Sequence, residues 1–354
     1  MIMIATQCFP PDFGGVENMM AGMAAEIVAL RRECAVFADG AATPWDADQT
    51  FSIRRFSGWK PIRHRLKAHA VNSACRDAEL LICDSWKSLE HLSPPDNLRV
   101  HCLAHGMEIP ANASQSKALR ITRAFAKSTK VIANSHYSAD LADRFRPTPV
   151  ARAIATPPIP PQPDPSRKAV ERIETNAGKG KTVIAFVGRL EPRKGVDHVI
   201  SALEHTPEDV IFLIAGGGPD RARLEAHAAA LGLRHRIFFL GYVDDDAKAA
   251  LLLRADIFAM PARREGASVE GFGIVYLEAG WYGTPSLAGI EGGARDAVLE
   301  NETGLFCDGA DKAAVCASLK TLIDDPSLRE RLGKAAAAHA RTQLWRLRIA
   351  DFIS

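Results

Sequence analysis

The amino-acid sequence predicts a two-domain α/β protein with parallel sheets. Short apolar segments alternate with longer helical segments along the chain, which is the pattern of parallel strands covered by helices. A chain of 354 residues is too long for one ordinary hydrophobic core. A proline-dense run at residues 156–165 is stiff and extended, as expected of a linker between two domains.

The first half contains the strands and one helix of the first predicted domain. The predicted strands are residues 3–5, 34–38, 80–83, 100–104 and 131–134. The helix 16–30 follows Gly14 and Gly15, which predict a tight turn between the first strand and this helix. His105 follows the fourth of these strands, and Ser135 follows the fifth. His105 therefore lies where ligands of open α/β sheets bind, at the carboxyl end of a strand.

The alternation restarts after the proline-dense run. The predicted strands are residues 182–188, 210–215, 237–240 and 257–260. The predicted helices are residues 195–203, 221–231, 245–255 and 273–282. Residues 244–246 are three consecutive aspartates before one of these helices, and N-capping explains them more simply than a metal site does.

The composition indicates a soluble globular protein. Hydrophobic residues make up 47% of the chain and the formal net charge is +2, so charge gives no indication of a nucleic-acid partner. No apolar run reaches the roughly 20 residues needed to span a bilayer. The start of the chain lacks the features of a signal peptide. The seven cysteines form no C-x-x-C pair, which favours reduced thiols in a cytoplasmic protein.

Residues 270–278 carry the strongest chemical signal. Glu270 precedes a glycine-spaced turn, where its carboxylate can accept hydrogen bonds from sugar hydroxyls. Glu278 lies inside a predicted helix, from which its carboxylate can reach a ribose diol. Between them, Gly271 and Gly273 allow backbone N–H groups at the helix start to approach a diphosphate. The segment therefore predicts a site for three parts of a nucleotide-sugar.

Two cations follow the first strand of the second predicted domain. Arg189 offers a planar fork for phosphate oxygens, and Lys194 offers a point charge. A departing diphosphate develops negative charge, and preorganised cations stabilise that charge. An alternative interpretation is that both are solvated charges at a strand end.

Four segments in this order resemble motifs of the retaining glycosyltransferases of the GT-B fold, in the large family 4. Residues 9–17 resemble the N-terminal glycine loop, and residues 104–108 the histidine-bearing loop. Residues 188–195 resemble the G-R-L-x-x-x-K-G signature, and residues 270–278 the E-x7-E motif. The resemblance implies two Rossmann-like α/β domains facing a central cleft.

The resemblance also implies a division of the chain and a set of roles. Residues 1–160 would bind the acceptor, residues 161–340 the nucleotide-sugar donor, and a helix in residues 341–354 would cross back to the first domain. The expected catalytic residues are His105, Glu270, Arg189 and Lys194. The expected donor-binding residues are Gly14, Gly15, Ser135, Arg189, Lys194, Gly271, Phe272, Gly273, Ile274 and Glu278. No cofactor or metal ligand is expected, because the cations and the helix start supply the positive potential.

The surroundings of the E-x7-E motif resemble those of GDP-mannose-dependent α-mannosyltransferases, particularly the phosphatidylinositol mannosyltransferases. That group commonly has proline at the position of Arg295 and serine at the position of Glu291. The expected reaction is retaining transfer of a hexose, mannose from GDP-mannose, to a glycolipid or to a polysaccharide or lipopolysaccharide precursor. A UDP-sugar donor, with glucosyl or N-acetylglucosaminyl transfer, and a GT-B nucleotide-sugar epimerase are the alternatives. The dinucleotide fingerprint of a dehydrogenase is missing.

Residues 54–67 form the most basic stretch of the chain. Its cations alternate with Phe56, Trp59, Ile62 and Leu66. Such a segment can rest on an anionic membrane surface or hold an anionic lipid-linked acceptor, with peripheral attachment at the inner face of the membrane. The alternative is an ordinary solvated helix.

Overall fold

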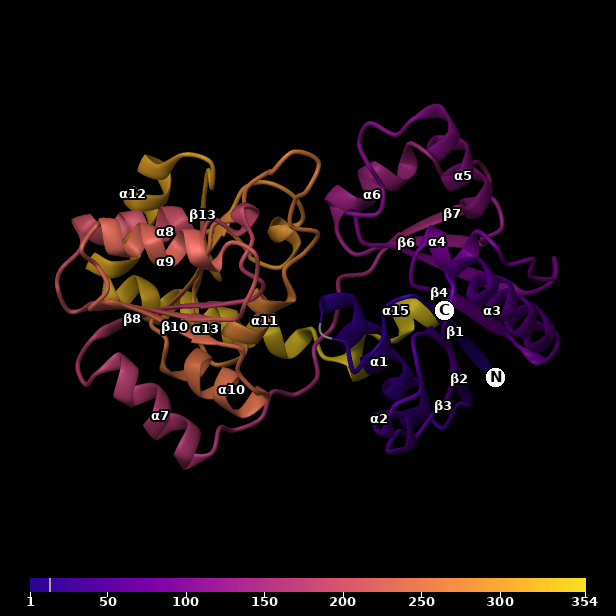
Figure 1. Ribbon diagram of the computed structural model, residues 1–354, viewed down its shortest axis with the longest axis horizontal. Helices are drawn as coiled ribbons and strands as arrows, with labels where there is room; N and C mark the ends of the chain where they lie inside the picture. The colour runs from indigo at the N-terminus through magenta and orange to yellow at the C-terminus, as the bar shows by residue number, and fades with distance from the viewer. Residues whose placement is uncertain (13) are drawn as a thin grey trace. The chain divides into compact units, whose positions relative to one another are not determined.

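The computed structural model describes residues 1–12 and 14–354, which form two compact units. The first unit contains Met1–Pro160 and Leu344–Ser354, and the second contains Pro161–Gln343. Each unit is built on one parallel β-sheet, as the alternation of apolar and helical segments predicts (Figure 1). Phe13, within the predicted glycine loop, lies outside the described residues.

The sheet of the first unit has seven strands in the order β3-β2-β1-β4-β5-β6-β7. The strands are β1 (Ile2–Thr6), β2 (Cys34–Asp39), β3 (Ser52–Phe56), β4 (Leu80–Cys83), β5 (Arg99–Ala104), β6 (Lys130–Ala133) and β7 (Ala151–Ile154). The helices are α1 (Gly15–Ala29), α2 (Pro44–Ala47), α3 (Lys60–Ala74), α4 (Trp86–Leu89), α5 (Gln115–Phe125), α6 (His136–Asp143), α14 (Trp345–Arg348) and α15 (Ala350–Ile353), with a 3-10 turn η1 (Cys75–Asp77).

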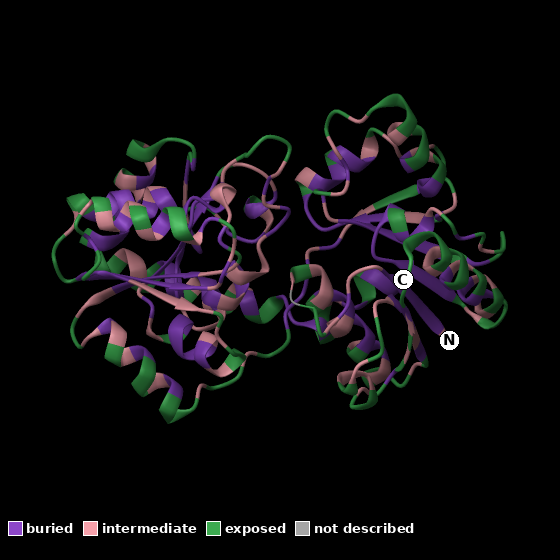
Figure 2. Cartoon of the chain, in the orientation of Figure 1, coloured by how far each residue is buried: buried purple, intermediate pink, exposed green. Residues whose placement is uncertain are grey.

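Both faces of this sheet are covered, which explains its apolar strands. On one face, Met3 and Ala5 of β1 pack into a core with α3, α4, α5 and α6. On the other face, Ile2 and Ile4 pack into a second core with α1, α14 and α15. Every residue of β1 is therefore buried, as is usual for strands of parallel sheets (Figure 2).

The C-terminal segment completes the second of these cores. Trp345 packs against α1 at Gly22, where an added Cβ would lie 2.3 Å from the indole Nε1. In β5, His101 places its Nδ1 2.7 Å from the carbonyl oxygen of Phe352. Burial lowers the pKa of His101 to about 4, so the neutral ring donates this hydrogen bond. His101 is thus a structural residue, consistent with its position inside the strand.

The sheet of the second unit has six strands in the order β10-β9-β8-β11-β12-β13. The strands are β8 (Thr182–Val187), β9 (Val210–Ala215), β10 (Ile237–Gly241), β11 (Ile257–Met260), β12 (Ser286–Gly289) and β13 (Gly304–Cys307). The helices are α7 (Arg167–Ala177), α8 (Val196–Ala202), α9 (Arg221–Ala230), α10 (Asp245–Arg254), α11 (Ile274–Trp281), α12 (Lys312–Asp324) and α13 (Pro326–Thr342), with 3-10 turns η2 (Pro192–Lys194), η3 (Leu203–His205) and η4 (Ala294–Asp296).

The helices of the second unit form a layer on each face of its sheet. Helices α8, α9 and α12 lie on one face, and α7, α10, α11 and α13 lie on the other (Figure 1). Helix α10 begins as predicted, because Oδ1 of Asp244 accepts a hydrogen bond from the Ala247 N–H at 2.8 Å. This carboxylate is therefore an N-cap.

The basic stretch 54–67 is not a single helix, which corrects the solvated-helix alternative. Its first residues belong to the edge strand β3, and α3 begins only at Lys60. Strand β3 escapes prediction because Arg54 and Arg55 interrupt any apolar run. Pairing with β2 nevertheless holds the segment extended.

Two further observations concern the chain as a whole. Within the described residues, every helix is too short or too polar to cross a bilayer. All seven cysteines carry free thiols, and five of them are buried: Cys34, Cys75, Cys83, Cys102 and Cys307.

Replacing Trp345 with Ala should destabilise the first unit by about 3–5 kcal/mol, because a large buried side chain is lost from its core. The measurement is urea unfolding followed by circular dichroism. Leu347→Ala is the control on the same segment, since that side chain is 58% exposed and its loss should change stability by less than about 0.5 kcal/mol. Equal effects of the two substitutions would contradict a packing role for Trp345.

Candidate functional site

The strand order of the second unit reverses between β8 and β11. Connections from these neighbouring strands leave towards opposite sides of the sheet, so their loops diverge and open a binding place at the carboxyl edge. The loop after β8 carries Arg189 and Lys194, and the loop after β11 carries Glu270. Three predicted site residues, up to 81 positions apart by their numbers (270 minus 189), therefore meet at one end of the sheet.

Lys194 and Glu270 form a buried ion pair. Oε2 of Glu270 accepts from Nζ of Lys194 and, at 3.0 Å, from Nη1 of Arg193. The three side chains are only 11–12% exposed. Glu191 extends the cluster, since it pairs with Arg193 at 2.9 Å and with Arg189 at 3.2 Å. Three cations against two carboxylates leave a net charge of +1, which suits an anionic ligand.

The ion pairs also determine the charge state of Glu270. Burial by itself would raise the pKa of this carboxyl, but the neighbouring Lys194 and Arg193 outweigh burial and hold the pKa below its usual value of 4.5. Glu270 is therefore a carboxylate at neutral pH. Both of these hydrogen bonds are accepted by Oε2 of Glu270.

The start of helix α11 provides backbone donors beside this cluster. Gly273 is the N-cap and has a φ of 88°, a left-handed conformation that favours glycine. The backbone N–H of Tyr276 donates to Gly273 O at 3.0 Å, and the N–H groups of Ile274 and Val275 precede this hydrogen bond in the first turn. Such first-turn N–H groups bind phosphate. The Phe272 side chain is buried, at 3% exposed, so only its backbone could take part in the predicted donor binding.

Glu278 lies one turn further along α11 and is held by a second lysine. Its Oε1 is 3.0 Å from Nζ of Lys248 on α10, and Lys248 also reaches Asp245 at 3.3 Å. Burial would lower the pKa of Lys248, but the two carboxylates outweigh it and raise the pKa. Lys248 is therefore charged at neutral pH and holds Glu278 through its Oε1.

In the first unit, Gly14 and Gly15 begin α1. Gly14 is the N-cap and Gly15 is the first helical residue. The carboxylate of Glu17 folds back over Gly14, where an added Cβ would lie 2.1 Å from Oε2. Any side chain at residue 14 would thus displace Glu17, so the glycine permits this close approach.

His105 and Ser135 follow the neighbouring strands β5 and β6. The backbone N–H of His105 donates to Oε1 of Glu108 at 2.8 Å, while its Nε2 is buried without a hydrogen-bond partner in the described part of the chain. A buried, unpaired ring nitrogen is suited to a ligand hydroxyl. Ser135 differs, because its buried hydroxyl caps α6 by accepting from Ser138 N at 3.1 Å. Its role in ligand binding stays a prediction.

The comparisons with known proteins agree with this geometry. Residues 168–339 match the family model described as glycosyl transferases group 1. Over 99% of the chain, the sequence is 29% identical to the GDP-mannose-dependent alpha-(1-6)-phosphatidylinositol monomannoside mannosyltransferase of Mycobacterium tuberculosis (strain CDC 1551 / Oshkosh), 97% of which is covered. Residues 168–339 therefore belong to the group 1 glycosyl transferases.

Other relatives of this group 1 glycosyl transferase agree in part of the chain or in fold. The D-inositol 3-phosphate glycosyltransferase of Corynebacterium efficiens is 40% identical over 46% of this chain and 39% of that relative. The crystal structure of Anabaena HepE in complex with UDP matches with a TM-score of 0.82 at 21% identity, over 99% of this chain and 98% of that one. The protein therefore has the predicted GT-B fold, and it is a hexosyltransferase.

The sequence did not indicate two residues of the candidate site, Arg193 and Lys248. Arg193 stands next to Lys194 within the G-R-L-x-x-x-K-G segment, so proximity was the available signal. Lys248 offered no such signal, because its pairing with Glu278 depends on how α10 packs beside α11. Among residues 1–12 and 14–354, no cluster of three His, Cys, Asp or Glu could hold a metal ion.

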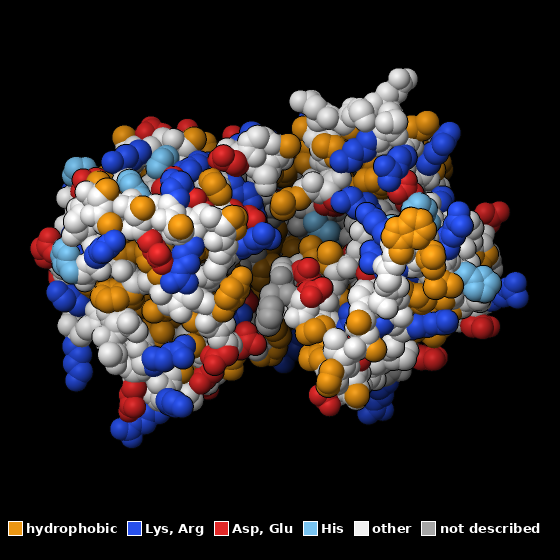
Figure 3. All heavy atoms as spheres, viewed as in Figure 1, with side chains coloured by type: hydrophobic (Ala, Val, Ile, Leu, Met, Phe, Trp, Pro, Cys, Tyr) orange, Lys and Arg blue, Asp and Glu red, His pale blue; other side chains and the backbone are white. Residues whose placement is uncertain are grey.

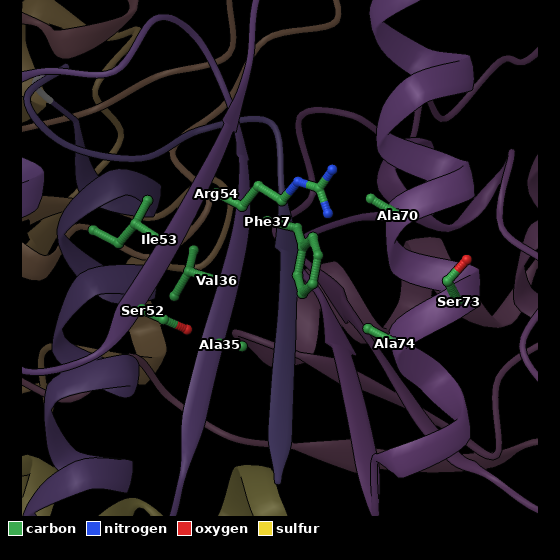
Figure 4. A pocket seen from close by; sticks show the side chains of 9 residues that line it. All are labelled: Ala35, Val36, Phe37, Ser52, Ile53, Arg54, Ala70, Ser73 and Ala74. Carbon is green, nitrogen blue, oxygen red and sulfur yellow. The ribbon is translucent and has the colours of Figure 1, made fainter.

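A cavity of about 440 Å³ lies elsewhere, between strands β2 and β3 and helix α3 of the first unit (Figure 4). Its lining includes Phe37, Arg54 and Ala70 and none of the predicted site residues. We place the site at the carboxyl edge of the second sheet, because the charged and backbone donors converge there.

Replacing Glu270 with Gln should lower the free energy of unfolding by about 3 kcal/mol at pH 7, because two buried cations lose their carboxylate. The folded pKa of Glu270 lies below 4.5, so the unfolded chain takes up the proton first on acidification. The wild-type advantage should therefore be full above about pH 4.5 and decline as pH falls through the folded pKa.

Chemical unfolding of both proteins between about pH 7 and pH 3 measures this advantage. Glu171→Gln on α7 is the control, since that side chain is 63% exposed and should change stability little. The ion pairing of Glu270 would be contradicted if the stability difference between wild type and Glu270→Gln were as large at pH 3 as at pH 7. An equal loss of stability in Glu171→Gln would also contradict it.

Proposed function

We propose that the protein is a retaining glycosyltransferase that transfers mannose from GDP-mannose to a glycolipid or polysaccharide-precursor acceptor without a metal ion. The observation that carries this proposal is the Lys194–Glu270 pair at the switch point, beside the start of α11. The full-length similarity to a GDP-mannose-dependent transferase supports the choice of donor. In this proposal the second unit binds the donor and the first unit binds the acceptor.

The diphosphate is assigned to Arg189, Lys194 and the first-turn N–H groups of α11. Cleavage of the bond between the sugar C1 and the phosphate oxygen leaves negative charge on the diphosphate. Positive groups fixed before the reaction stabilise that charge without reorganising. Lys194 is fixed by Glu270, while Arg189 is 70% exposed and can close on the phosphate. Glu278 is assigned to the ribose hydroxyls.

The sugar is assigned to Glu270 in the second unit. A double displacement needs a carboxylate nucleophile, but Glu270 is bound by two cations and is better suited to hold a sugar hydroxyl. We therefore favour a front-face transfer. The acceptor hydroxyl forms its bond to C1 on the face that the diphosphate leaves, and its proton passes to the departing phosphate oxygen. In the first unit, His105 is assigned to a ligand hydroxyl, which its Nε2 would bind.

A thermal-shift screen against GDP, GDP-mannose, UDP, UDP-glucose and ADP, with and without EDTA, tests the donor. Because a ligand stabilises the fold by mass action, we expect a selective shift with GDP and GDP-mannose that EDTA leaves unchanged. Glu278→Ala should lose the shift. Glu225→Ala on α9, whose side chain is 44% exposed, is the control and should keep it. A shift only with uridine or adenine nucleotides would refute the GDP-mannose donor.

We also propose that α3 attaches the first unit to an anionic membrane surface, near a lipid-linked acceptor. Trp59, Ile62 and Leu66 are 72%, 53% and 56% exposed, and their spacing places them along one face of the helix. Lys60 and Arg65 are exposed beside them. Hydrophobic side chains lie among Lys and Arg side chains on the visible face of this unit (Figure 3). This pattern is typical of helices that lie in a membrane interface.

The proposed membrane-binding surface of the protein includes only part of the basic stretch 54–67. Lys67 is only 4% exposed and, together with Arg63, pairs with Asp39. Arg55 pairs with Asp46 at 2.6 Å. These three cations stabilise the fold, and neutralising them would not test membrane binding.

Replacing Trp59, Ile62 and Leu66 together with Ser should abolish co-sedimentation with vesicles that contain phosphatidylglycerol, because the apolar anchor is removed. Neutralising Lys60 and Arg65 with Gln should weaken binding most at low salt. Met107→Ser with Leu119→Ser is the matched control, since both side chains are exposed elsewhere on the first unit. Unchanged sedimentation of the triple variant would refute the proposal.

A further inference from the structure

Tyr242 is the most exposed large hydrophobic side chain of the described residues, at 83%. It directly follows β10, so it stands at the carboxyl edge of the second sheet, the edge that carries the candidate site. Tyr242 belongs to none of the four motif segments and is not part of the ion-pair cluster around Glu270. An aromatic ring left open to solvent at a ligand-binding edge is a candidate contact surface.

One side of the Tyr242 ring lies against the protein backbone at Gly217. An added Cβ at Gly217 would lie 2.7 Å from Cε2 of Tyr242 and 3.0 Å from its Cζ, so one side of the ring lies against this glycine. The loop around Gly217 is fixed in turn. Leu190 N donates to Gly217 O at 2.9 Å, and Gly216 N donates to Gly241 O at 2.7 Å. Gly217 therefore gives the ring a fixed backing, and the other side of the ring is open.

The position of the ring relative to the donor groups follows from short links along the chain. Asp244, two residues after Tyr242, caps α10, and Lys248 N donates to Asp244 O at 2.9 Å within the first turn. Lys248 then reaches Glu278 at 3.0 Å. With the diphosphate at the start of α11 and the ribose at Glu278, the base attached to that ribose extends towards the start of α10. Tyr242 stands there.

We propose that Tyr242 is the stacking surface for the nucleobase of the donor, and that its open face favours a purine. This inference rests on the proposed function, since it assumes the diphosphate and ribose positions given above. Stacking on an aromatic side chain contributes about 1–3 kcal/mol per base and needs no hydrogen-bond pattern. A larger purine face overlaps the phenol ring more fully than a pyrimidine does. Gly217 is then required because any side chain there displaces the ring.

The test is calorimetric titration of GDP, UDP and inorganic pyrophosphate into the wild-type protein and its variants. Tyr242→Ala should weaken GDP binding about 10-fold or more. Tyr242→Phe, which keeps the aromatic face, should stay within about twofold. Gly217→Val should weaken GDP binding although Tyr242 is present. Pyrophosphate, which lacks the base, should bind all these variants like the wild type. Leu253→Ala, at a 50% exposed position on α10, is the control.

The outcomes separate this inference from the proposed function. If Glu278→Ala weakens GDP binding and Tyr242→Ala does not, the stacking role is wrong and the donor site stands. If Tyr242→Ala weakens pyrophosphate as much as GDP, the ring supports the fold and does not stack. If the wild type binds UDP and not GDP, the purine preference is wrong. In that case, weaker UDP binding by Tyr242→Ala would support the stacking role, and unchanged UDP binding would refute it. If no nucleotide binds the wild type, both proposals fail.

Discussion

The buried pair of Lys194 and Glu270 is the interaction on which the candidate site depends. It joins the loops that leave β8 and β11, and those loops otherwise diverge at the switch point. Close backbone packing surrounds the pair. An added Cβ at Gly195, Gly289 or Gly309 would lie only 1.7–2.3 Å from the carbonyl oxygen of Pro261 or Ala262. The three glycines therefore let the loop after β11 pack closely against neighbouring backbone, and this packing supports the position of the ion pair.

The first sheet also has a point at which its strand order reverses, but the charged groups there differ from those in the second sheet. Its strand order reverses between β1 and β4, where Oδ2 of Asp84 accepts from Oγ1 of Thr6 at 2.9 Å and from Gln7 N at 2.8 Å. Uncharged donors thus bind the carboxylate there, whereas cations outnumber carboxylates in the second unit. This contrast supports assigning the anionic donor to the second unit.

Sequence reasoning was strongest where a strand is buried on both faces. The predicted bounds of β4, β9 and β11 coincide with the observed ones, because apolar runs mark such strands. Edge strands β3, β7 and β13 and the small-residue strand β12 were missed, since pairing and not apolar character keeps them extended. Within the site, the motifs named Lys194 and Glu270 individually. Their contact depends on the parallel pairing of β8 with β11, which no local pattern contains.

The discontinuous first unit has a consequence for how the chain is made. Residues 344–354 contribute Trp345 and Phe352 to the core that α1 begins near the other end of the chain. Helix α1 leaves the ribosome long before Trp345 does. The α1 methionines (Met19, Met20 and Met23) therefore lack their packing partners Trp345 and Phe352 while the second unit is being synthesised. During that interval the second unit, which is continuous in sequence, can fold first. The earlier-synthesised unit is therefore completed only after the second unit has been synthesised, and until then the nascent chain exposes an apolar face of α1.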